Sequence, residues 1–229
     1  MLWQQYGWTI DLDGINWTAE ELVKIWKAGT AVEGWFETNG GGDSAGRMRA
    51  VFGGTFFSSV SKSLAAKFWT ELNNYNHVIG KTVYLLDTFS INTIIHELGH
   101  VLDNSLAKVH YPGGASVFGG GPGDDMARAI GLDPTECTFR FQCDWERIAM
   151  SSGAEMNPLK YGRTHGPSED FADSFLLSVL GGLGRAPIRE KFMRDLAVSQ
   201  VQTQPEYPGM YSAYLRSPIL PVTAPTPPR

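Results

Sequence analysis

The chain has 229 residues, of which 42% are hydrophobic, enough apolar material for one globular domain with its own core. The formal net charge of −5 and the lack of a Lys/Arg cluster argue against nucleic acid or an anionic membrane surface as a partner. No apolar run approaches the roughly 18 residues of a membrane span, and the first residues do not combine a basic region with an apolar core, so we expect neither a span nor a signal peptide in this chain.

The first predicted element is a helix that begins after Thr18. Thr18 and Glu21 have the spacing of a capping box, in which each side chain pairs with the backbone N–H of the other residue. Apolar residues at helical spacing follow. We expect this helix to reach about Ala28 and to end at Gly29.

A strand followed directly by a helix is predicted in the middle of the chain. Glycines over 39–43 and at 53–54 indicate two turns, and the residues over 64–72 indicate a helix. The short apolar run Thr82–Leu86 is typical of a strand, which we expect at the edge of a small sheet, where an extended substrate could pair with it. A helix over about 90–104 is predicted immediately afterwards.

The second half of the chain contains two more predicted helices. The glycine-rich segment over 111–123 and the residues up to about 150 show no strong periodicity, so we expect a long insertion there, near the site described below. Helices are predicted over about 168–180, ended by the glycines at 181–182, and over about 187–201.

The chain ends in a proline-rich segment. The residues over 205–229 cannot bury a core and are typical of an extended tail or linker. We therefore expect one domain over 1–204, with an N-terminal part over about 1–105 and a C-terminal part over about 106–204.

Cys137 and Cys143 are the only cysteines in the sequence. A local disulfide in an exported protein and two reduced thiols in a cytosolic protein both fit them, whereas a CxxC-type zinc site does not fit their spacing. With the proline- and threonine-containing tail, the paired cysteines favour a secreted or extracellular protein. We expect a monomer.

His96, Glu97 and His100 form an HExxH motif. Residues four apart lie on one face of a helix, so both imidazoles can bind one metal ion, and zinc accepts this pair of ligands. Glu97 can reach a metal-bound water without binding the metal itself, which suits a general base. The alternative is a buried helix with two incidental histidines, which the helical context of the motif disfavours.

Tetrahedral zinc needs a third protein ligand beside two histidines and a water. The metzincin continuation is absent, because Asp103 and Leu106 stand where that motif has glycine and histidine. Glu169 and Asp173 lie four apart on a later predicted helix, which fits a glutamate ligand and a supporting carboxylate one turn on. As the alternative, Glu169 could simply favour the N-terminus of that helix.

A metal-bound imidazole also needs an acceptor for its other N–H. Asp173 can supply that acceptor. Asp103, roughly in line with His96 and His100 on the motif helix, is a second candidate, although a solvated helix position explains it equally well.

Two blocks of the sequence resemble the catalytic domain of anthrax lethal factor and its relatives, including the secreted Pro-Pro endopeptidases. The block over about 90–104 contains the HExxH motif and is shared by many zinc peptidases. The block over about 158–180 is more specific, with Tyr161-Gly162-Arg163-Thr164 ahead of Glu169-Asp170-Phe171-Ala172-Asp173. The resemblance and the strand-then-helix order imply an α+β zincin-like fold, with a small sheet whose edge strand lies at the cleft and a mainly helical C-terminal part.

By this resemblance Glu169 is the third zinc ligand, of gluzincin type, and Tyr161 faces the metal. A phenol there could donate a hydrogen bond to an oxyanion, whereas a buried aromatic under the loop is the alternative for Tyr161. Tyr161 precedes Glu169 by eight residues, one more than the family pattern. His165 lies between them and is expected to be a surface-loop histidine.

Together these residues predict a zinc-dependent endopeptidase that hydrolyses peptide bonds through one zinc-activated water, with Glu97 as general base. The expected partner is a peptide or protein substrate. Two alternatives stay open: a catalytically silent, zinc-containing binding or toxin-like module, and a zinc hydrolase of a non-peptide amide. Glu97 and Tyr161 together disfavour the silent module, because a structural zinc site needs neither residue.

Overall fold

The computed structural model describes residues 2–11, 17–60, 77–79, 81–86, 88–106, 109–110, 118–119, 121–136, 144–159 and 166–199. Within these ranges the chain is mostly helical with a small sheet, so the coarse prediction of an α+β fold is confirmed. Several predicted features lie outside the described residues: the helix over 64–72, both cysteines, Tyr161, His165 and the tail over 205–229.

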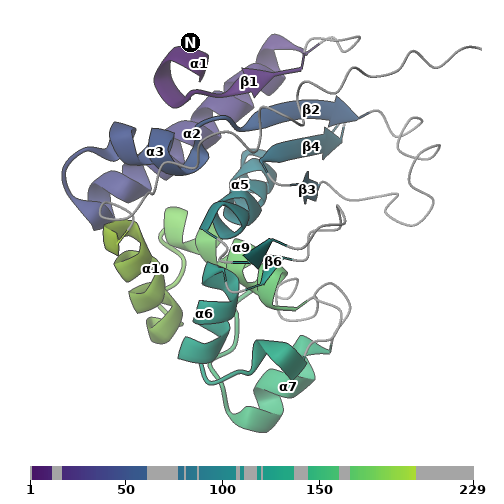
Figure 1. Cartoon of the computed structure of the whole chain (residues 1–229), viewed down its shortest axis with the longest axis vertical. Helices are drawn as coiled ribbons and strands as arrows, with labels where there is room; N and C mark the ends of the chain where they lie inside the picture. Colours follow the sequence, from purple (N-terminus) through teal and green to yellow (C-terminus); the bar gives the residue numbers. More distant parts are fainter. Residues whose placement is uncertain are drawn as a thin grey trace, which may run out of the picture.

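The main sheet has four strands in the order β1-β2-β4-β3 (Figure 1). The strands β1 (Thr9–Ile10), β2 (Phe56–Val60) and β4 (Thr82–Leu86) run parallel, and β3 (His77–Ile79) pairs antiparallel with β4. Alternate residues of β4 are buried, so that Val83 and Leu85 enter the main hydrophobic core. One face of the sheet therefore packs on helices.

The strand predicted over Thr82–Leu86 is confirmed, but its expected place at the edge of the sheet is wrong. β4 lies between β2 and β3, and in the described part of the sheet the edges are β1 and β3. An apolar, β-branched run looks the same in sequence whether one or both sides of the strand are paired, because pairing depends on strands elsewhere in the chain.

Three N-terminal helices pack together: α1 (Leu2–Tyr6), α2 (Ala19–Gly40) and α3 (Ser44–Phe52), with α3 in contact with both α1 and α2. The capping box at Thr18 is confirmed, since its side chain accepts from the Glu21 N–H and the Glu21 carboxylate accepts from the Thr18 N–H. The predicted end of α2 at Gly29 is wrong.

Gly29 lies in the middle of α2 because two aromatic rings pack against its backbone. A Cβ atom at Gly29 would lie 2.7 Å from Cε2 of Tyr6 and 3.0 Å from the ring of Trp8, both of which are buried. The helix continues to Gly40, and the break comes at Gly41, where φ is +58°. Gly29 therefore allows the two aromatic rings to pack closely on α2 and does not end the helix.

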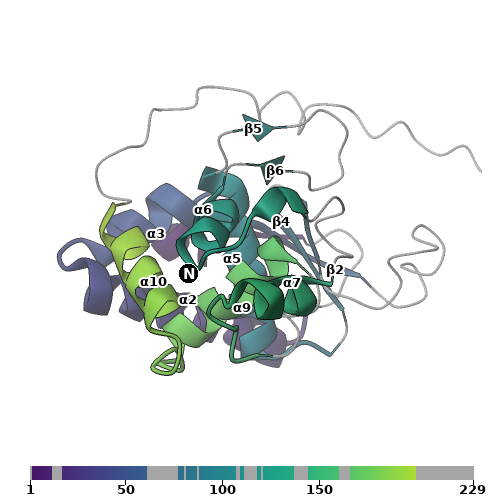
Figure 2. The same ribbon diagram turned by 90° about the horizontal axis from the view of Figure 1, so that it is seen from below.

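The segment that follows the motif helix contains more regular structure than its weak periodicity suggests. It includes the strand pair β5 (Val109–His110) and β6 (Phe118–Gly119), α6 (Pro122–Ala129), the 3-10 turn η1 (Pro134–Glu136) and α7 (Trp145–Ser152). These helices are short, and they are held by a small core of their own, formed by Ala127, Ile130, Leu132, Trp145, Ile148 and Ala149. Figure 2 shows the β5–β6 pair at the periphery of the molecule.

Three helices complete the site region: α5 (Ile91–Leu106), α9 (Pro167–Val179) and α10 (Pro187–Ser199). Their predicted positions are confirmed within one or two residues, including the stop after α9, where Gly181 has φ of +73°. α5 contacts β4 on one side and α9 on the other (Figure 1). No helix in the described part of the chain is long and apolar enough to cross a membrane.

Candidate metal centre

The two motif histidines lie on one face of α5. The helix begins after Ser90, whose Oγ accepts from the N–H of Thr93 at 3.0 Å. One helical turn separates His96 from His100, and their ring centroids are 4.9 Å apart. The opposite faces of the helix are held in the core by five fully buried side chains: Ile94, Ile95, Leu98, Val101 and Leu102. This packing fixes the direction of both imidazoles.

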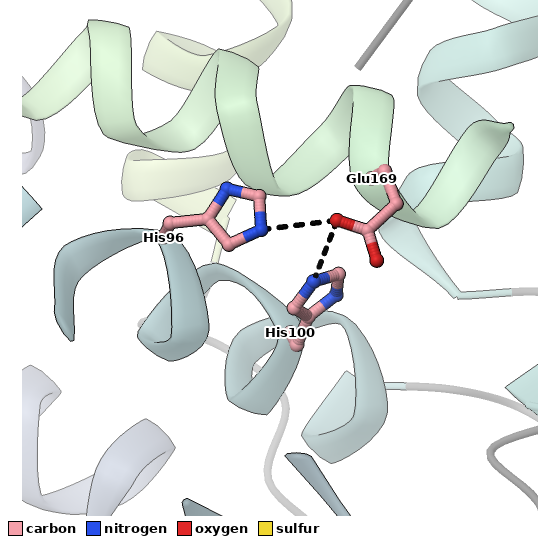
Figure 3. Close-up of side chains that lie close together, drawn as sticks. All are labelled: His96, His100 and Glu169. Carbon is pink, nitrogen blue, oxygen red and sulfur yellow. Dashed lines mark hydrogen bonds and ion pairs between the residues drawn. The ribbon is translucent and has the colours of Figure 1, made fainter. Parts of the chain in front are cut away.

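Glu169 lies on α9, which packs very closely against α5. Gly99, between the two histidines, makes this possible, because a Cβ atom there would lie only 2.8 Å from Cα of Ala172. The Oε2 atom of Glu169 lies 3.0 Å from Nε2 of His96 and 3.2 Å from Nε2 of His100 (Figure 3). Three side chains from two helices therefore point at one place.

This group could hold a metal ion. Its three donor atoms all lie within 4.8 Å of one another. Two ligands that are each about 2.1 Å from a tetrahedral ion lie about 3.4 Å apart, close to the distances found between Glu169 and the histidines. Two imidazoles and a carboxylate form a borderline donor set that suits zinc and other transition metals better than calcium or magnesium.

Both histidines have a hydrogen-bond partner on the ring nitrogen that faces away from Glu169. Nδ1 of His96 lies 2.8 Å from Oδ1 of Asp173, and Nδ1 of His100 lies 3.2 Å from Oγ of Ser168. Such contacts orient an imidazole and fix which nitrogen is free for a metal. Asp173 was expected in this place from the sequence. Ser168 was not, because a serine at the start of a helix usually signals only a cap.

Asp103 is buried on α5, one turn beyond His100. Its Oδ1 accepts from the backbone N–H of Gly123 at 2.7 Å, and Gly121 also approaches its carboxylate so closely that a Cβ there would lie 2.5 Å from Oδ1. Asp103 thus anchors the start of α6 on α5. The predicted support of a metal-bound histidine by Asp103 stays a prediction.

The electrostatics of the surrounding side chains favour positive charge on the two histidines. Burial lowers the pKa of His96, but its hydrogen bonds to Asp173 and Glu169 outweigh this and raise the pKa to about 10. The pKa of His100 is also raised, by Glu169 against the effect of burial. The pKa of Glu169 is lowered, because the two histidines outweigh its burial. The pocket therefore stabilises cations, whether protons or a metal ion.

Glu97 lies beside the candidate ligands and is only 4% exposed. Its Oε2 atom is buried without a hydrogen-bond partner within the described part of the chain. Burial raises the pKa of this carboxyl, although the neighbouring histidines oppose the shift. A buried, unsatisfied carboxylate oxygen costs stability, so its presence beside two candidate ligands points to a chemical role.

The structure thus brings together five of the residues singled out in the sequence, namely His96, Glu97, His100, Glu169 and Asp173. Tyr161 and His165 fall outside the described residues.

A separate hollow of about 800 Å³ lies between α1, β1 and the start of α2. It is lined by Leu2, Trp3, Trp8, Thr9, Ile10, Leu22, Val23 and Trp26. None of these side chains ionises, so the described lining of that hollow offers no acid, base or metal ligand.

Comparison of the chain with protein-family models, with curated proteins and with solved structures gives no match. The geometry of the site and the resemblance of the two sequence blocks are therefore the basis for a functional proposal.

Proposed function

We propose that this protein is a zinc-dependent endopeptidase, in which His96, His100 and Glu169 hold one zinc ion and Glu97 is the general base. The observation that carries the proposal is the convergence of two imidazoles and a carboxylate from α5 and α9, beside a buried carboxylate oxygen of Glu97 that has no partner among the described residues. Three protein ligands would leave one position of a tetrahedral zinc ion for water or substrate, which is typical of catalytic rather than structural zinc sites.

The zinc ion, when bound, would supply Lewis-acid chemistry: it would polarise the carbonyl of the scissile bond and lower the pKa of a water. Glu97 takes the proton of the attacking water and passes it to the leaving amine. Its raised pKa suits this role, because a base whose pKa lies closer to the working pH transfers the proton more readily in both directions.

The surrounding side chains keep the ligands in place during this proton transfer. Asp173 and Ser168 hold the two imidazoles through their Nδ1 atoms, so the Nε2 atoms face Glu169. Tyr161 would donate a hydrogen bond to the oxyanion of the tetrahedral intermediate, a role that comes from the resemblance to the lethal factor group. The substrate would be a peptide or protein, and export of the protein stays part of the proposal.

The test is a comparison of the wild-type protein with Glu97→Gln. Both proteins are loaded with zinc, their metal content is measured, and cleavage is followed on a proteome-derived peptide library. We expect equal zinc content and an activity about 10² to 10⁴ times lower in Glu97→Gln, because the amide cannot accept the proton. Full activity of Glu97→Gln would refute the assignment.

The same assay, extended to a panel of non-peptide amides, separates the two alternative functions: a silent zinc-binding module and a hydrolase of non-peptide amides. Wild-type protein that binds zinc but cleaves neither peptides nor small amides would be a silent binding module. Cleavage confined to a panel of non-peptide amides would make the protein a hydrolase of another kind. The cleavage-site profile from the library would also decide whether proline directs cleavage.

A further inference from the structure

Two consecutive acidic residues at the start of α9 point in different directions. Successive residues of a helix are rotated by about 100°. Glu169 faces the two histidines of α5, whereas Asp170 is 1% exposed and faces the packing between α7, α9 and α10. The direction of Glu169 is therefore tied to whatever holds Asp170.

Asp170 is held by three donors that come from three different segments. Its Oδ2 accepts from Nε1 of Trp145 at 2.9 Å, and its Oδ1 accepts from Nδ2 of Asn157 at 2.6 Å. Nη1 of Arg189, on α10, forms an ion pair with Oδ1 at 2.9 Å. All four side chains are buried, so water does not compete for these contacts.

Arg189 is in turn fixed on the side away from Asp170. It is 1% exposed, and its Nη2 donates to the backbone carbonyl of Glu155 at 2.8 Å. The Glu155 carboxylate accepts from the backbone N–H groups of Ile188 and Arg189 at 2.8 and 2.9 Å, at the start of α10. A buried guanidinium is costly to unpair, so it tolerates little movement of its partner.

We propose that the Asp170–Arg189 pair is a positioning device for the metal site. It sets the rotation of the first turn of α9, so that Oε2 of Glu169 lies between the Nε2 atoms of His96 and His100. This inference rests on the proposed function, because it assigns a purpose to the direction of Glu169. Asp170 and Arg189 touch neither substrate nor metal, and they act only through Glu169.

The test uses Asp170→Asn, which keeps the size of the side chain and removes its charge. Three quantities are measured: the zinc dissociation constant by competition with a chelator, the visible spectrum of the protein loaded with cobalt(II) in place of zinc, and the free energy of unfolding in urea. We expect zinc affinity to fall about tenfold or more and the cobalt spectrum to change, because the carboxylate ligand is misplaced.

Val51→Ala is the matched control, since Val51 is fully buried on α3 and takes no part in the contacts described for Asp170 and Arg189, so its truncation costs stability by another route. We expect it to lower the free energy of unfolding and to leave zinc affinity and the cobalt spectrum unchanged. If Asp170→Asn behaves like Val51→Ala, the pair is merely structural and the inference is wrong.

Trp145→Phe keeps the test valid if Asp170→Asn does not fold, because it removes only one N–H from Asp170 and keeps an aromatic ring in the core. A smaller loss of zinc affinity in the same direction supports the inference, and unchanged affinity overturns it. Wild-type protein that binds zinc but cleaves no peptide would refute the proposed peptidase activity, while the affinity comparison would still decide the role of Asp170.

Discussion

At the scale of single residues, the 2.8 Å contact between Nδ1 of His96 and Oδ1 of Asp173 should govern metal affinity. Asp173→Asn keeps the shape of the side chain and loses the charge that holds the imidazole. We expect zinc affinity to fall about 10- to 100-fold, the usual effect of removing a partner that orients a ligand. Chelator competition measures this change.

Asp195→Asn is the control for that change, because Asp195 lies exposed on α10 and pairs with Lys191. Its zinc affinity should equal that of the wild-type protein. Equal affinity of Asp173→Asn and the wild-type protein would show that the contact does not orient His96.

The metal-free protein should lose stability as the pH rises from about 6.5 to about 10. The pKa of His96 is raised from 6.5 to about 10 in the folded state, so its stabilising contribution is complete below pH 6.5 and is lost towards pH 10. The pKa of Glu169 is lowered from 4.5, so its contribution is present above pH 4.5 and is lost in acid. Urea unfolding in EDTA, from about pH 2 to about pH 10, tests both limbs of this profile.

His96→Ala is the matched variant for the pH profile. It lacks the titrating group, so its stability should decline less over the same range. An identical decline in both proteins would show that His96 does not carry the effect.

The sequence predicted the three side chains that converge, His96, His100 and Glu169, better than most of the groups that hold them in place. The spacing of His96 and His100 reflects helix geometry, which can be derived from local sequence. Glu169 was singled out by its four-residue spacing from Asp173 and by the resemblance of the second block. Ser168 and the Asp170–Arg189 pair could not be found in this way, because their partners come from helices that meet only in the folded chain. Local patterns do not report such contacts.

At the scale of elements, the distance between α5 and α9 depends on Gly99. In an exposed helix, replacing glycine by alanine stabilises by about 0.5 to 1 kcal/mol. At Gly99 the added Cβ would lie 2.8 Å from Cα of Ala172, so Gly99→Ala should instead destabilise by about 1 to 3 kcal/mol and weaken zinc binding. Urea unfolding and chelator competition measure the two effects.

Gly34→Ala makes the same change in α2, where an added Cβ would meet no described atom within 4 Å apart from the backbone of its own helix and its chain neighbours. We expect this variant to be more stable than the wild-type protein, with unchanged zinc affinity. If Gly99→Ala were stabilised to the same degree, α5 and α9 would not be in close contact.

The helix end and the strand position that were predicted wrongly also depend on contacts between segments that are distant in the sequence. Gly29 looks like a helix stop, but it lies within α2 because Tyr6 and Trp8 pack against its backbone. The strand Thr82–Leu86 was placed at an edge, although β3 covers it. In both cases packing by a distant segment decides the outcome, whereas the capping box at Thr18 and the stop at Gly181 are local and were predicted.

At the scale of the whole molecule, the candidate metal site joins two parts of the chain that are distant in sequence. His96 and Glu169 are 73 residues apart, and the intervening residues include α6 and α7. In an unfolded chain the three ligands would rarely meet, so a metal ion should bind the folded state almost exclusively. Binding and folding should therefore be coupled.

Zinc should consequently raise the unfolding temperature, and EDTA should reverse the effect. At a free zinc concentration about 100 times the dissociation constant, binding adds about 2.7 kcal/mol. For a domain of this size each kcal/mol corresponds to about 2 to 4 °C, so we expect a rise of about 5 to 11 °C by differential scanning calorimetry. The double variant His96→Ala/His100→Ala should show no rise. A similar rise in that variant would mean that zinc stabilises the protein at some other place.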